Sequence, residues 1–79
     1  INEAFAVVAI VAIRELKLDP AKVNMAGGAV AIGHPIGATG ARILNSVIRG
    51  LERTGKRLGI ACLCIGGGEA DAVAVERLG

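Results

Sequence analysis

Two short runs of residues in this sequence could carry acid–base or nucleophilic chemistry. One is Cys64-Ile65-Gly66-Gly67-Gly68, and the other, upstream of it, is Gly33-His34-Pro35-Ile36-Gly37. Backbone N–H groups of glycines are open to a ligand and can hold a developing oxyanion. A thiol beside such groups suits acyl chemistry or removal of a proton next to a carbonyl. An imidazole beside glycines could serve as the partner base.

Each of these two side chains also has a plain structural interpretation. A lone histidine usually lies on the surface or makes satisfied hydrogen bonds in a core, and a free cysteine is commonly buried as a small apolar residue. The flanking Gly33 and Pro35 indicate a rigid loop just before a helix, which favours a functional role for His34. The position of Cys64 at a strand end before glycines favours function, whereas Cys62 fits the buried structural case.

Three further patterns have more than one interpretation. The glycines of the segment 37–40 stand at an expected helix start, but no lysine follows, so a P-loop is excluded and close approach of another backbone is preferred. Metal binding by His34, Cys62 and Cys64 would leave an ion short of ligands, so no metal is expected. Asn2 is equally suited to cap a helix and to serve in a site.

The elements that must position these residues follow from periodicity. Ala4–Leu16 is apolar almost all round, which predicts a helix that is buried on every side and closed by the Asp19-Pro20 turn. Val23–Met25 is a candidate short strand, and the small residues of 27–35 predict an irregular segment. A second, amphipathic helix is expected from residue 37 or 39 to about Arg53.

The last third of the sequence predicts a pair of strands. Gly55 is the expected C-cap of the second helix. Leu58–Ile65 is apolar on both faces, which is typical of a strand in the centre of a sheet. The glycines at 66–68 interrupt it, and Ala70–Glu76 alternates as a second strand. The short link predicts antiparallel neighbours, so the fold class is α/β, with a helix, a short strand, a helix and two antiparallel strands.

Composition limits the classes of protein. The chain has 79 residues, of which 53% are hydrophobic, and this is too apolar for a small free-standing domain. The longest apolar run, Ala4 to Ile13, is well below the roughly 18–20 residues that span a bilayer. We therefore expect a piece of a larger protein with faces buried against parts outside it. A net charge of +2 with a single aromatic residue disfavours nucleic-acid binding, and two cysteines make no disulfide framework.

Three motifs together carry a family resemblance. Asn2-Glu3-Ala4-Phe5-Ala6, the run from Gly33-His34-Pro35 to Arg42, and Cys64-Ile65-Gly66-Gly67-Gly68 resemble, in this order, the C-terminal segment of the thiolases. These enzymes are the acetyl-CoA acetyltransferases and 3-ketoacyl-CoA thiolases. The resemblance covers nearly the whole chain and implies that residues 1–79 are part of the C-terminal domain of a layered αβαβα fold. The first helix resembles the one sandwiched between sheets in that fold.

The resemblance also implies roles. His34 resembles the residue that activates the nucleophilic cysteine and donates to a thioester oxygen, and Asn2 the residue that holds a water beside it. Cys64 resembles the acid/base that moves the α-proton of acetyl-CoA, and the N–H of Gly66 resembles part of a second oxyanion hole. The substrate tunnel would be lined by Ala4 and Phe5. The nucleophilic cysteine itself lies in the family's N-terminal half and has no counterpart here.

Several expectations follow for the whole protein. Acyl-CoA and coenzyme A would be its substrates with no further cofactor, and the N-terminal half of the parent thiolase would be its partner within a homodimer or homotetramer. The fragment alone is expected to be inactive, and the location to be intracellular, cytoplasmic or in an organellar matrix. The alternatives are a non-catalytic thiolase-like module that scaffolds or carries lipid, and an independently folded small protein.

Overall fold

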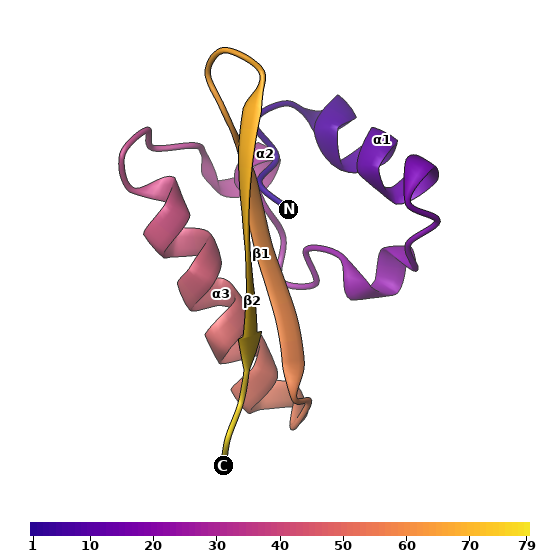
Figure 1. Ribbon diagram of the computed structural model, residues 1–79, viewed down its shortest axis with the longest axis vertical. Coiled ribbons are helices and arrows are strands. Elements are labelled where there is room, and N and C mark those ends of the chain that lie inside the picture. The colour runs from indigo at the N-terminus through magenta and orange to yellow at the C-terminus, as the bar shows by residue number, and fades with distance from the viewer.

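A long helix packed along a two-stranded hairpin forms the centre of the molecule, described here from a computed structural model of residues 1–79 (Figure 1). The helix α3 packs against β1, while α1 stands apart on the other side of the hairpin in this view. The elements in chain order are α1 (Ala6–Glu15), the 3-10 helix η1 (Pro20–Lys22), α2 (Ala29–Ile32), α3 (Thr39–Thr54), β1 (Leu58–Ile65) and β2 (Glu69–Glu76).

The amphipathic helix α3 forms as predicted. It begins at Thr39, and Gly55 ends it in the left-handed conformation with φ of 70°, which glycine adopts without a steric penalty. Its apolar stripe buries Ile43 and Leu51 against the sheet. Helix and strand approach each other closely at Gly59, where an added Cβ would lie 2.5 Å from Cγ1 of Val47. A glycine in β1 therefore sets the helix–sheet spacing.

The hairpin of β1 and β2 confirms the predicted antiparallel pair. The register pairs Leu58 with Glu76 and Ile65 with Glu69, so β2 begins one residue earlier than expected. The loop at 66–68 turns with φ of 95° at Gly67 and 87° at Gly68, a conformation that favours glycine. The prediction that β1 is central in a sheet is not met within these residues, because the sheet has two strands and β1 pairs with β2 alone.

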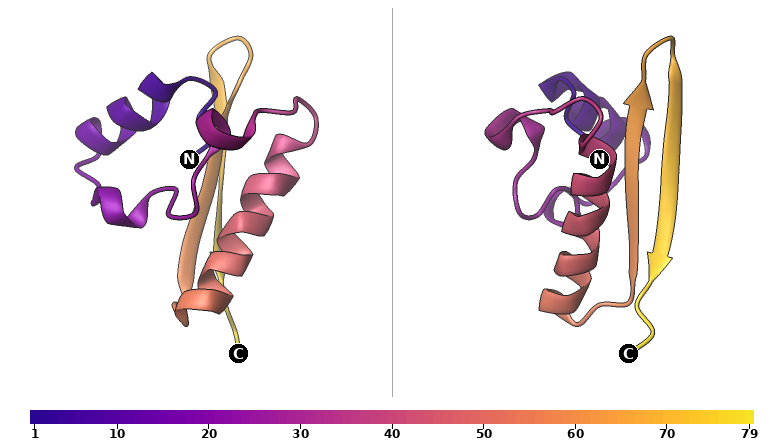
Figure 2. Two further views of the ribbon diagram at one scale, coloured as in Figure 1. Left: turned by 180° about the vertical axis from the view of Figure 1, so that it is seen from behind. Right: turned by 90° about the vertical axis from the view of Figure 1, so that its left-hand side faces the viewer.

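The segment between α1 and α3 differs most from the predictions. The expected strand Val23–Met25 is wrong, since this stretch forms bends and turns and Asn24 has a left-handed φ of 47°. The Asp19 side chain instead accepts a hydrogen bond from the Ala21 N–H, which caps η1. The stretch expected to be irregular contains the short helix α2. Two views in Figure 2 show this segment looping out from α1 and returning to the hairpin.

The helix α1 is shorter and more exposed than its sequence predicts. It spans Ala6–Glu15 and its N-cap position is Phe5, so Asn2 does not cap it. Ala9 is its one buried residue, whereas the side chains of Val7 and Ile10 are each 57% exposed. Most of the apolar surface of α1 is therefore not covered by other parts of these 79 residues. No helix here has both the length and the apolar character needed to cross a membrane.

Candidate active site

The N-terminal segment is attached to β1 close to Cys64. The backbone N–H of Asn2 donates a 2.9 Å hydrogen bond to the carbonyl of Cys62. Asn2 is almost fully buried, with 1% of its surface exposed. Cys64 lies two positions further along the same strand, on the same face, since alternate residues of a strand point to one side. The first and third sequence motifs therefore meet at the end of β1.

The carboxylate of Glu3 holds the segment that leads into the second motif. One oxygen accepts a 3.1 Å hydrogen bond from the N–H of Val30 in α2, and the other accepts from Nδ2 of Asn24 at 3.2 Å. Gly28 makes room for this carboxylate, because an added Cβ there would overlap it. An N–H in the first turn of a helix lacks a helical partner, and Glu3 supplies one. Since α2 ends directly before Gly33 and His34, the clamp by Glu3 ties the histidine loop to Asn2.

The side chain of Asn2 has one polar group engaged and one free. Its Oδ1 accepts a long, 3.5 Å hydrogen bond from Nη2 of Arg42 in α3. Its Nδ2 is buried and has no partner in the chain, and the same holds for Nε of Arg42. Buried N–H groups without a partner are uncommon in proteins. Asn2 therefore retains a donor that can be offered to a ligand, and the helix-capping alternative for this residue is wrong.

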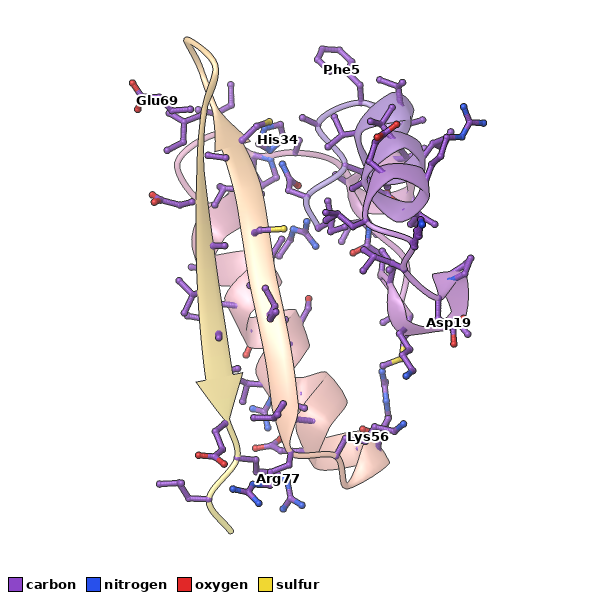
Figure 3. The ribbon with its side chains drawn as sticks, turned by 45° about the vertical axis from the view of Figure 1, so that its right-hand side comes forward. Phe5, Asp19, His34, Lys56, Glu69 and Arg77 are labelled. Carbon is purple, nitrogen blue, oxygen red and sulfur yellow. The ribbon has the colours of Figure 1, made fainter.

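The imidazole of His34 is held by a residue that the sequence analysis did not single out. Nδ1 of His34 lies 2.7 Å from Oγ1 of Thr39, the first residue of α3. Gly33, directly before the histidine, has a φ of 98° that favours glycine. Figure 3 shows His34 beside the upper end of β1. The sequence offers only a weak signal for this contact, a threonine at a helix start five residues after a histidine.

Cys64 and the glycine turn form the exposed rim of the site. Cys64 is exposed and Cys62 is half-buried, and both are free thiols. Gly66 follows β1 directly, and its N–H takes part in none of the turn and loop hydrogen bonds between backbone groups. A thiol that is open to solvent and a backbone donor two residues further on can both face a ligand. No three or more histidine, cysteine or acidic side chains cluster in a way that could hold a metal ion.

The two residues expected to line a substrate tunnel precede α1. Ala4 is half-buried, and Phe5 is 73% exposed. Figure 3 shows Phe5 at the same end of the molecule as His34, pointing outward. The small residues around the start of α3 differ from their predicted packing, because an added Cβ at Gly37 or Gly40 would meet no atom within 4 Å. Within this chain, no other backbone approaches that helix start closely.

The fold and the site together define an α/β segment that carries an imidazole, a thiol and backbone donors at one end of a hairpin. Residues 1–77 match the family model described as "Thiolase, C-terminal domain". The chain belongs to the thiolase family. The predicted α/β class is confirmed: this is part of the thiolase fold, although its expected short strand is absent.

Individual relatives support the same assignment. The chain is 53% identical over 78 residues to the steroid 3-ketoacyl-CoA thiolase FadA6 of Mycobacterium tuberculosis and covers 19% of that protein. It is 54% identical over 77 residues to the cytosolic acetyl-CoA acetyltransferase of Mus musculus, again covering 19%. The crystal structure of the Bacillus anthracis acetyl-CoA acetyltransferase superposes with a TM-score of 0.93 at 52% identity, covering 98% of this chain and 20% of that one. The chain thus spans about a fifth of the length of these relatives.

Replacing Glu3 by alanine in the full-length protein should loosen the histidine loop. We expect the N–H of Val30 to exchange with solvent about fivefold faster, because a hydrogen bond contributes about 1 kcal/mol to local stability. Hydrogen exchange read by mass spectrometry over residues 26–36 measures this. Glu15→Ala, at the exposed end of α1, is the matched control and should leave the exchange unchanged. Unaltered exchange in Glu3→Ala would show that the carboxylate does not hold the loop.

Proposed function

We propose that this chain is the C-terminal catalytic segment of a thiolase, with residues 1–79 forming part of its C-terminal domain. The intact enzyme would transfer an acyl group between an enzyme cysteine and coenzyme A, forming or cleaving a carbon–carbon bond in a 3-ketoacyl-CoA. The observation that carries this proposal is the convergence of the three motifs at one end of β1. It rests on the bond from Asn2 to Cys62, two residues before Cys64, and on the bond from Arg42 of the second motif to Asn2. The names of the relatives supply the substrate class.

In the proposed mechanism, His34 and Asn2 act on the acylation step. His34 accepts the proton of the nucleophilic thiol and then donates to the thioester oxygen. Asn2 offers its unpaired Nδ2 to a water beside His34, completing the first oxyanion hole. The burial of this donor supports the role, because a fixed N–H in a site closed to bulk water stabilises developing charge more strongly than one in solution.

Cys64 and Gly66 act on the carbon–carbon bond step. The thiolate of Cys64 removes the α-proton of acetyl-CoA, and in the reverse direction its thiol protonates the leaving carbanion. The N–H of Gly66 holds the enolate oxygen that develops in this step. Ala4 and Phe5 line the path of the pantetheine and acyl chain. The exposure of Cys64 and Phe5 supports these assignments, since each side chain is open to a bound substrate.

The nucleophile must come from the part of the parent outside this chain. Cys62 does not replace it, because its side chain is half-buried in the middle of β1 and lies in no glycine-rich turn. The N-terminal half of the parent is therefore the proposed partner, in a homodimer or homotetramer within the cell. Coenzyme A thioesters serve as substrates, and no further cofactor enters the proposed chemistry.

The test is turnover by the full-length protein. We expect coenzyme A-dependent cleavage of acetoacetyl-CoA, followed by the loss of absorbance of its enolate, and no cleavage by the 79-residue chain alone. A full-length protein without this activity, but with a bound lipid recovered by mass spectrometry, would favour the non-catalytic module instead. Turnover by the isolated chain would show that the nucleophile lies within it.

A further inference from the structure

The hydroxyl of Thr39 occupies a confined position between two acceptor-capable groups. Thr39 is 2% exposed and lies at the first position of α3. Its Oγ1 is 3.0 Å from the carbonyl oxygen of Pro35 and 2.7 Å from Nδ1 of His34. The backbone N–H groups of Ala38 and Thr39 donate to the same carbonyl at 2.9 and 3.1 Å, and the Thr39 side chain adds the link from this turn to the imidazole.

The single proton of the hydroxyl decides which ring nitrogen of His34 carries a proton. A carbonyl oxygen can only accept, and two oxygens 3.0 Å apart repel unless a proton lies between them, so Thr39 donates to Pro35. Oγ1 then has only lone pairs to offer to Nδ1 of His34. The 2.7 Å contact is favourable when Nδ1 carries the hydrogen. In the neutral ring, Nε2 is then the nitrogen without a proton.

We infer that Thr39 is a positioning residue that fixes His34 in the tautomer protonated at Nδ1 and leaves Nε2 free to accept a proton. This inference rests on the proposed function, because it assigns the base of the acylation step to one atom. The contact also serves the next state. When Nε2 takes a proton the ring becomes a cation, Nδ1 remains a donor, and Oγ1 of Thr39 remains its acceptor. No rearrangement is needed between the two states.

The kinetic test compares two substitutions at position 39 in the full-length protein. Thr39→Val keeps the shape but removes the acceptor, so we expect kcat for acetoacetyl-CoA cleavage to fall about 10- to 100-fold while KM changes little. Thr39→Ser keeps the hydroxyl and should restore kcat to near the wild-type value. Wild-type kcat in Thr39→Val, or equal losses in both variants, would overturn the inference, because the hydroxyl would then be dispensable or only packing would matter.

The chain offers a matched control for the helix itself. Thr54 makes the same kind of bond at the other end of α3, from its Oγ1 to the carbonyl of Gly50 at 2.8 Å. Thr54→Val should therefore leave kcat unchanged. A loss of kcat in Thr54→Val equal to that in Thr39→Val would overturn the inference, because it would attribute the effect to helix stability rather than to His34.

A second measurement needs neither activity nor a stable variant. Neutron diffraction from deuterium-exchanged crystals of the wild-type full-length protein locates the deuterium on the His34 ring. Density on Nδ1, directed at Oγ1 of Thr39, is the expected result. Density on Nε2 alone would overturn the inference whatever the variants do. If the protein proves to have no thiolase activity, the proposed function fails, while this experiment still decides the tautomer.

Discussion

Cys64→Ala in the full-length protein should abolish carbon–carbon bond formation while the nucleophilic cysteine still becomes acylated. The thiol at the end of β1 is proposed to move the α-proton, and acylation precedes that step. Loss of a general acid–base group lowers the rate by about 10²- to 10⁴-fold. The fall should appear in condensation of acetyl-CoA and in cleavage of acetoacetyl-CoA alike, because one proton transfer serves both directions.

Two measurements separate the steps in this variant. Mass spectrometry of the protein after mixing with acetyl-CoA reports the acyl-enzyme, and the rate of acetoacetyl-CoA formation reports condensation. Cys62→Ala is the control, since Cys62 is on the same strand and face but is half-buried and further from the glycine turn. It should condense at close to the wild-type rate. Condensation at the wild-type rate in Cys64→Ala would remove Cys64 from the mechanism.

The elements that the sequence predicts well are those whose signals are local. The apolar stripe of α3, its C-terminal Gly55 and the glycines at 66–68 each act within a few residues of one another, and each appears in the structure at the expected place. Antiparallel pairing of β1 and β2 follows from the short connection alone. These features need no knowledge of the rest of the fold.

The errors arise where tertiary contacts override local preference. Val23–Met25 has apolar residues that suit a strand, but Asn24 turns with a positive φ and its side chain bonds to Glu3. The apolar pattern of α1 predicts burial on all sides, yet most of its side chains are exposed in these 79 residues. A hydrophobic pattern shows that a surface should be covered but not which part of a protein covers it.

The residues of the candidate site also fall into two groups, those that the sequence indicates and those that only the structure shows. His34, Cys64 and the glycine turn are candidates from the sequence because their residue types suit acid–base chemistry. Glu3 and Thr39 were missed as supporting residues, because their importance lies in partners: Glu3 bonds to Val30, far along the sequence, and Thr39 bonds to an imidazole. A carboxylate near a helix start and a threonine at a helix start are common in any sequence. Only the folded chain shows what they hold.

His34→Gln should block the reaction one step earlier than Cys64→Ala. The proposed base for the nucleophilic thiol is then absent, and glutamine, which keeps a polar side chain of similar size, cannot accept and return a proton. We expect the rate of acyl-enzyme formation to fall by about 10²- to 10⁴-fold, and turnover in both directions to fall with it. Rapid mixing with acetyl-CoA, followed by mass spectrometry of the quenched protein, measures this rate directly.

The two variants together test the division of labour between the imidazole and the thiol. If the assignment holds, Cys64→Ala accumulates acyl-enzyme and His34→Gln does not, even though both lose overall turnover. A steady-state assay alone would not distinguish them, because turnover fails in either case. Accumulation of acyl-enzyme by His34→Gln at the wild-type rate would contradict the role of His34 in activating the nucleophile. It would also leave Thr39 holding a ring that takes no part in acylation, so the tautomer it fixes would have no bearing on that step.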